Sequence, residues 1–171
     1  MNSCLIYGAG GHARVVADAA IAAGNVVLAF IDDHATISSL NQVPVSDHIP
    51  PALDRMPLVI GIGSNTLRKQ IAERLSQPFA TIIHPTAVIA PGAVIGAGSV
   101  VLAHAVVQTG AIIGRHVIIN AHACIDHDAA IEDYAHIYPH SYIGGGSRVK
   151  EGVTIGPGTM VLRDTIVTAD R

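Results

Sequence analysis

Large β-branched residues recur at every sixth position through the second half of the chain. Between residues 83 and 167 each of these positions holds Ile or Val, and a smaller residue (Ala, Ser, Thr or Val) follows four places after each of the first fourteen. The fifteen positions are Ile83, Ile89, Ile95, Val101, Val107, Ile113, Ile119, Ile125, Ile131, Ile137, Ile143, Val149, Ile155, Val161 and Val167. This pattern predicts units of one short strand and one turn, with the larger residue pointing inward. Three units would form a coil of eighteen residues, and stacked coils would bury a continuous core.

The first half of the chain has a different pattern, typical of a small α/β unit. Buried strands are predicted at 4–7, 26–31 and 58–63, helices at 13–23 and 66–76, and a short strand at 80–83. The first three elements have βαβ order, as in one half of a dinucleotide-binding fold. We therefore predict an α/β, half-Rossmann-like unit over residues 1–80 and a parallel β-helix over residues 81–171.

A glycine-rich loop joins the first predicted strand to the first helix. It contains Gly8, Gly10, Gly11 and His12, and two acids follow about twenty residues later. Backbone N–H groups at a helix N-terminus can hold a phosphate. Such a loop occurs often as a structural tight turn too, so the motif alone leaves both interpretations open. If it binds a ligand, a mononucleotide diphosphate is favoured over NAD, because the second half of a dinucleotide fold is absent.

The composition narrows the class of protein. Hydrophobic residues make up 50% of the 171 positions and charged residues 13%, which excludes a disordered chain. A net charge of −3 gives no basic surface for nucleic acid. No apolar run is long enough to span a bilayer, and the first residues do not form a signal peptide. We expect a cytoplasmic protein in which both cysteines are reduced.

Three of the ten histidines, His104, His122 and His140, are spaced eighteen residues apart. They should stack along one edge of the solenoid, where exposed turn residues are the favoured interpretation. A zinc site is the alternative, with His122 and His127 as a ligand pair. No third histidine completes that pattern, so we expect no metal.

His127 has a carboxylate on each side, Asp126 and Asp128. A carboxylate beside an imidazole fixes its tautomer and raises its basicity, as a general base requires. His136 follows nine residues later, half a coil away, so the two histidines should face different sides. They could share one site only between neighbouring subunits, and this spacing favours a trimer of parallel solenoids.

Taken together, these motifs resemble the bacterial sugar acetyltransferases of the PglD/NeuD type, which have a left-handed parallel β-helix of hexapeptide repeats. The resemblance rests on Gly8-Ala9-Gly10-Gly11-His12, Ile31-Asp32-Asp33, Gly63-Ser64-Asn65, Ile83-His84-Pro85, Ile119-Asn120, Asp126-His127-Asp128 and His136-Ile137-Tyr138-Pro139. It implies an acetyl-CoA-dependent N-acetyltransferase acting on a UDP-4-amino-sugar in glycan biosynthesis. O-acetylation of a sialic acid or related sugar is one alternative, and a non-catalytic solenoid scaffold is another.

The resemblance also implies roles for single residues. His127 would be the general base, oriented by Asp126. Substrate would be bound by Gly8, Gly10, Gly11, His12, Asp32, Asp33, Asn65 and Asn120. Acetyl-CoA would contact His136 of an adjacent subunit, Gly144, Gly145 and Ile155, with backbone amides near Gly144 and Gly145 stabilising the oxyanion. Members of the family usually continue beyond the last coil seen here, so we expect C-terminal coils to be missing.

Overall fold

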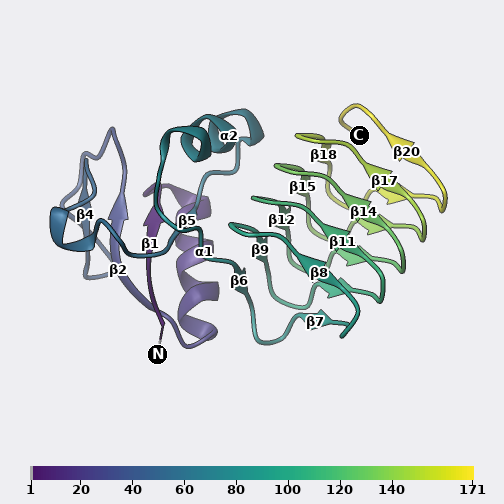
Figure 1. The fold of residues 1–171 in the computed structure, drawn as a ribbon, viewed down its shortest axis with the longest axis horizontal. Coiled ribbons are helices and arrows are strands. Elements are labelled where there is room, and N and C mark those ends of the chain that lie inside the picture. The colour runs from purple at the N-terminus through teal and green to yellow at the C-terminus, as the bar shows by residue number, and fades with distance from the viewer. Residues whose placement is uncertain (1) are drawn as a thin grey trace.

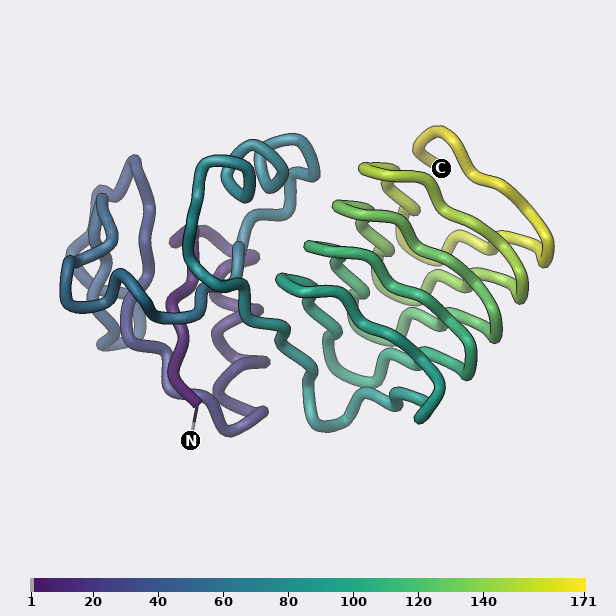
Figure 2. Tube along the Cα trace, in the orientation of Figure 1, coloured from purple at the N-terminus to yellow at the C-terminus, as the bar shows by residue number. Residues whose placement is uncertain are grey.

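The computed structural model describes residues 2–171 and consists of an α/β unit followed by a three-sided β-solenoid (Figure 1). The two ends of the solenoid lie at opposite ends of the prism (Figure 2). The α/β unit faces one side of the prism and contacts both its first and its later coils. Neither α-helix within residues 2–171 has the length and hydrophobicity that crossing a bilayer requires.

The α/β unit is built on one five-stranded sheet. Its elements are β1 (Ser3–Tyr7), α1 (Gly11–Ala22), β2 (Val26–Ile31), β3 (Ser39–Leu40), β4 (Val43–Ser46), the 3₁₀ helix η1 (Pro51–Leu53), β5 (Leu58–Ile60) and α2 (Asn65–Arg74). The strand order is β3-β4-β2-β1-β5, with only β3 antiparallel to its neighbour. The βαβ prediction is confirmed. The short strands β3 and β4 were not predicted, because Pro44 and polar neighbours mask their weak alternation.

The two helices cover opposite faces of this sheet. Residues of α1 pack with Phe30 and Val59 of the sheet and also with Ile82 and Val100 of the solenoid. Residues of α2 pack on the other face. Helix α1 is therefore the layer between the sheet and the prism.

Every coil of the solenoid contributes one two-residue strand to each of three parallel sheets. The strands are β6 (Ile82–Ile83), β7 (Val88–Ile89), β8 (Val94–Ile95), β9 (Val100–Val101), β10 (Val106–Val107), β11 (Ile112–Ile113), β12 (Ile118–Ile119), β13 (Cys124–Ile125), β14 (Ala130–Ile131), β15 (His136–Ile137), β16 (Tyr142–Ile143), β17 (Arg148–Val149), β18 (Thr154–Ile155), β19 (Met160–Val161) and β20 (Ile166–Val167). Each sheet has five strands, and paired residues such as Ile82 and Val100 are eighteen apart. The hexapeptide prediction is confirmed in register.

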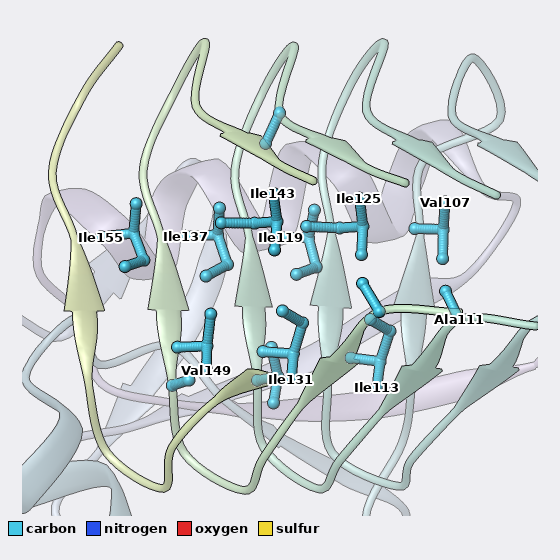
Figure 3. Close-up of a cluster of buried hydrophobic side chains, with 14 of the residues drawn as sticks. Val107, Ala111, Ile113, Ile119, Ile125, Ile131, Ile137, Ile143, Val149 and Ile155 are labelled. Carbon is cyan, nitrogen blue, oxygen red and sulfur yellow. The ribbon is translucent and has the colours of Figure 1, made fainter. Parts of the chain in front are cut away.

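The second residue of each strand points into the prism and forms its core. From Val101 to Val167 these side chains are at most 2% exposed, and they stack in columns (Figure 3). Burying one such side chain contributes about 1.5–3 kcal/mol relative to leaving it in water. The first strand residue points outward, so a shift of one residue would exchange core and surface.

The turns between strands share one unusual backbone conformation. At every sixth residue from Gly98 to Asp164, φ is positive. Five of these twelve positions are Gly and the others are His, Asp or Tyr, although a non-glycine residue there costs about 1–2 kcal/mol. The predicted histidine column is confirmed: His104, His122 and His140 occupy this position on one edge, with ring centroids 5.0 and 4.8 Å apart.

A fourth histidine in this conformation, His116, is enclosed where the two parts of the molecule meet. Its ring stacks on Tyr134 and meets Phe79 edge-on, and neither ring nitrogen has a hydrogen-bond partner. Burial, helped by the positive charges of Arg115 and Arg68, lowers the pKa of His116 to about 4. The neutral imidazole thus acts as an apolar ring in this contact.

This burial predicts that acid weakens the fold. The unfolded chain takes up a proton at His116 near pH 6.5 but the folded chain only near pH 4, so stability present above pH 6.5 is lost as pH falls. We expect a loss of roughly 3 kcal/mol from this residue across that window. Chemical denaturation at several pH values should show a flatter pH dependence in His116→Asn. His122→Asn, at the same backbone conformation on an exposed edge, controls for the substitution itself; an unchanged slope in His116→Asn would contradict the assignment.

Candidate functional site

The first candidate region lies at the carboxyl ends of β1, β2 and β5. The chain leaves β1 toward β2 on one side, and β5 lies on the other side, which is where open α/β sheets bind ligands. A cavity of about 210 Å³ opens here. Its lining consists of Tyr7, Gly8, Asp32, Asp33, His34, Ile62, Leu67, Gln70, Ile71 and Arg74. Three residues predicted to bind substrate, Gly8, Asp32 and Asp33, are thus brought together.

The glycine loop has no room for a side chain at Gly8 and leaves the start of α1 open at Gly10. Gly8 has φ +104°, and a Cβ there would lie 2.6 Å from the Ile62 side chain. Gly10, the residue before α1, faces open space. Asp32 holds the loop, since its Oδ2 accepts the Ala9 N–H at 2.8 Å. The first N–H groups of a helix lack partners within it, so this end of α1 can receive an anion.

Asp33 belongs to a charged cluster at the rim of the cavity. Its carboxylate accepts hydrogen bonds from the Tyr7 hydroxyl and the Arg74 guanidinium. Burial acts to raise the pKa of Asp33, but these two donors outweigh it, and the pKa lies below its ordinary value. Sequence reasoning missed Tyr7 and Arg74, because Arg74 reaches the loop only through the docking of α2.

The second candidate region surrounds His136 on the wall that faces the α/β unit. His136 is 4% exposed; its Nδ1 lies 3.4 Å from the Gly63 carbonyl oxygen, and its Nε2 lies 3.4 Å from the Asn120 amide nitrogen. The ring stacks on Tyr138 and its centroid is 6.0 Å from that of His12. The fold thus gathers three predicted site residues, His12, Asn120 and His136, within one chain.

Asn65 lies at the same boundary, but its side chain hydrogen-bonds to other groups of the protein. Its amide nitrogen donates to the Gly152 carbonyl at 2.9 Å and the Thr154 hydroxyl at 3.1 Å, and its oxygen accepts from Arg68 at 2.8 Å. Both N–H donors of Asn65 are therefore used to join α2 to the solenoid. This corrects the expectation that its side chain is free to bind substrate.

The third candidate region is the edge between β13 and β14, where His127 is half exposed. The His127 Nδ1 lies 2.8 Å from Asp128 Oδ2. Asp126, which we expected to orient the ring, instead accepts the His127 backbone N–H and the Tyr142 hydroxyl, at 2.8 and 2.7 Å. The contact with Asp128, aided by the charge of Asp126, raises the pKa of His127.

Gly145 leaves the other side of the imidazole accessible. A Cβ at this position would lie 2.8 Å from His127 Nε2, so any larger residue would crowd the nitrogen that faces away from Asp128. At this edge, Nε2 of His127 is therefore accessible, while Nδ1 of the same ring is held by the Asp128 carboxylate. That arrangement suits removal of a proton from a bound group.

Three expectations for acetyl-CoA contacts need correction. Ile155 is fully buried, because the second residue of every strand points into the prism, and it cannot touch a ligand. The Gly144 N–H donates to the Val161 carbonyl at 2.9 Å and is not free to stabilise an oxyanion. His136 is covered by the α/β unit of its own chain, which leaves little of it for a neighbouring subunit to contact.

Within residues 2–171, no group of three or more His, Cys, Asp or Glu side chains is arranged to hold a metal ion. The stacked column of His104, His122 and His140 is exposed, in line with turn residues.

Comparisons with known proteins agree with this description. Residues 3–75 match the family model of the PglD N-terminal domain. The acetyltransferase domain of PglB from Neisseria gonorrhoeae FA1090 is 32% identical, with a TM-score of 0.73, over 99% of this chain and 93% of that one. A search of curated proteins gives no match.

Two further solved structures extend the comparison. A variant of perosamine N-acetyltransferase from Caulobacter crescentus, in complex with CoA and GDP-perosamine, is 31% identical, with a TM-score of 0.82, over 99% of this chain and 90% of that one. WeeI from Acinetobacter baumannii AYE, 24% identical with a TM-score of 0.68 over 99% and 93% of the two chains, shares the fold. The common architecture is the left-handed β-helix, so the expected hand is confirmed. With this likeness along almost its entire length, the chain belongs to the PglD/NeuD-type family of sugar acetyltransferases.

Proposed function

We propose that this protein transfers the acetyl group of acetyl-CoA to the amino group of a nucleotide-linked amino sugar, with His127 as general base. One observation carries the proposal: the perosamine enzyme, similar over 99% of this chain, was solved with CoA and GDP-perosamine together. The PglB domain was likewise solved with acetyl coenzyme A. We infer UDP as the nucleotide from the sequence resemblance, and GDP is the second candidate because the perosamine enzyme binds it.

The cavity of the α/β unit supports the nucleotide half of this proposal. An open helix N-terminus at Gly10 suits a diphosphate, and the adjoining cavity carries both acceptors, at Asp33, and donors, at Arg74. Polar groups of both kinds can hydrogen-bond a nucleoside. Asp32, Gly8 and Gly11 would serve by shaping the loop that holds the phosphates.

The edge at His127 supports the chemical half. In the proposed step the sugar nitrogen forms a bond to the thioester carbonyl carbon while His127 Nε2 takes a proton from that nitrogen. Collapse of the intermediate breaks the carbon–sulfur bond, and the imidazolium returns its proton to the departing thiolate. Asp128 stabilises the imidazolium formed on the way, and holding both reactants in place supplies the proximity term.

The two halves of the site lie on different sides of one prism. His127 is at the edge between β13 and β14, whereas His136 and the nucleotide cavity lie on and beyond the β6-β9-β12-β15-β18 sheet. We therefore propose that the complete site forms between subunits of a homotrimer. Five outward residues on the two sheets flanking the His127 edge are large, apolar and exposed: Val88, Met160, Val94, Ile112 and Ile166.

The test of this function is a thiol-release assay with acetyl-CoA and a panel of sugars. Amino sugars linked to UDP and to GDP are compared with free sialic acid, and mass spectrometry locates the new acetyl group. N-acetylation of a nucleotide-linked sugar supports the proposal. Acetylation of a hydroxyl only would favour the O-acetyltransferase, and acetyl-CoA binding without any transfer would favour a scaffold.

His127 gives the first kinetic prediction. His127→Ala should lower kcat by about 10²–10⁴-fold, the range for loss of a general base, without changing thermal stability, because the side chain is half exposed. Near-normal turnover would remove His127 from this role.

Asp128 gives a pH prediction with a defined sign. The base works only when neutral, so kcat/KM should fall as pH drops through a pKa that lies above the ordinary histidine value. Asp128→Asn removes the nearest negative charge and should move this acid limb to lower pH while reducing the plateau rate. Asp164→Asn, two coils further along the same edge and paired with Arg163, is the matched control. An acid limb that stays in place in Asp128→Asn would contradict the role.

The proposed homotrimer is tested by a substitution on the exposed apolar surface beside the His127 edge. Ile112→Glu should convert the trimer into monomers and abolish turnover, because Ile112 is 58% exposed in the single chain and its loss leaves the core intact. Light scattering coupled to size exclusion measures the mass. Ile21→Glu alters an equally exposed isoleucine on α1 and should leave the trimer intact. A fully active monomeric wild type would refute the shared site.

A further inference from the structure

Arg68 of α2 is a charged side chain that is 1% exposed. Its guanidinium donates to six oxygens gathered from both parts of the molecule. They are the carbonyls of His116 (2.8 Å), Ile62 (3.0 Å), Gly63 (3.2 Å), Tyr134 (2.6 Å) and Ala135 (3.4 Å), and the Asn65 side chain (2.8 Å). All five N–H donors of an arginine are thereby used, so Arg68 cannot itself bind a ligand.

All six acceptors are neutral. In the described part of the chain Arg68 makes no ion pair with a carboxylate. Burying an ion is costly unless its surroundings compensate, and here carbonyl oxygens do so without cancelling the charge. A positive field therefore persists at the boundary between α2 and the solenoid.

The guanidinium also fixes what surrounds His136. The Gly63 carbonyl accepts from Arg68 and lies 3.4 Å from His136 Nδ1, and Ala135, the residue before His136, is another Arg68 acceptor. A carbonyl can only accept, so His136 Nδ1 carries the hydrogen. The Asn120 oxygen is held by the Ala121 N–H at 2.8 Å, which leaves the Asn120 amide N–H₂ to face His136 Nε2. Nε2 must then be the unprotonated nitrogen.

The groups that face His136 favour this neutral tautomer. They are Arg68 from α2, His12 from α1, and Asn120 and Tyr138 from the solenoid. Burial first, and then the charge of Arg68 and the nearby His12, lower the pKa of His136 to about 4. Burial and Arg68 also lower the pKa of His12.

We propose that Arg68 is a positioning residue of the transfer site: it locks the Gly63 loop onto the wall and holds His136 as a neutral imidazole whose Nε2 accepts from the Asn120 amide and so orients Asn120, a proposed substrate contact. The role rests on the proposed function, in which this wall and the nucleotide cavity form one half of a site shared between subunits. Arg68 acts through His136 and His12 and touches no reacting atom.

Imidazole NMR of ¹⁵N-histidine-labelled full-length protein tests this without any turnover. In the wild type, His136, assigned from the spectrum of His136→Gln, should keep the Nδ1–H tautomer from pH 8 to about pH 5. In Arg68→Met it should titrate at higher pH and lose its fixed tautomer. A wild-type His136 that is protonated at pH 6, or that carries its hydrogen on Nε2, overturns the proposal.

Kinetics separate the charge of Arg68 from its geometry. Arg68→Lys keeps the charge but offers three donors to six acceptors, so kcat should fall at least tenfold with the pH profile in place. Arg68→Met should also raise the pH at which the His136 imidazole titrates, while the acid limb of kcat/KM stays with His127. The matched control, Lys69→Met, removes an exposed cation paired with Glu151 one residue away and should change neither property.

Each outcome tests one part of the proposal. If Arg68→Lys turns over like the wild type, the hydrogen-bonded geometry is dispensable and the positioning role fails. If Arg68→Met folds and loses rate while His136 keeps its wild-type titration and tautomer, the role of Arg68 is structural only. Should Arg68→Met not fold, the wild-type tautomer and Arg68→Lys still decide. A protein that shows the predicted tautomer but acetylates no sugar would refute the proposed function and leave the Arg68 contacts standing.

Discussion

Everything in this molecule depends on the inward stacking of Ile and Val at eighteen-residue intervals. The inward side chains of each coil pack against those of the coils above and below, so the register of one coil fixes that of the next. The edges and walls of the prism are set by the same repeat. His127 stands at an edge and His136 on a wall because they occupy different places within the six-residue unit. The chemistry is thus placed by the core rather than by loops.

The α/β unit is attached to this rigid surface by two unlike contacts. Helix α1 packs on the wall through apolar side chains, while Arg68 of α2 joins carbonyls from three segments. Apolar contact supplies most of the attraction, and directional hydrogen bonds select one orientation. The nucleotide cavity and the wall at His136 therefore have a defined geometry relative to each other, which a transfer between two bound substrates requires.

The sequence was sufficient for features that depend on period or on local spacing. The strand register, the inward positions, the histidine column and the βαβ loop all follow from such patterns. Features that depend on docking were not accessible. Arg68 falls within the helix predicted over residues 66–76, where it stands three and four places before the buried Ile71 and Ala72 and so shares their face. That spacing was the one signal of its burial.

Two errors at single residues have other origins. Ile155 was assigned to acetyl-CoA although its place in the repeat puts it inside the prism, a conclusion that the periodicity itself could have given. The choice of Asp126 over Asp128 beside His127 could not have been made from sequence, because both flank the ring. Asp128 has φ +59° and its carboxylate lies 2.8 Å from His127 Nδ1, whereas the Asp126 carboxylate accepts the His127 backbone N–H and the Tyr142 hydroxyl.

The eighteen-residue coil also limits how such a protein can change its length. Inserting or deleting a few residues below His127 would rotate it off its edge and expose the inward column at the same time. A gain or loss of one entire coil preserves both, and shifts His127 by about 4.8 Å along the prism axis relative to the wall on which the α/β unit is seated. Divergence in this architecture should therefore proceed by duplication of complete turns, with the spacing between the two halves of the site changing in discrete steps.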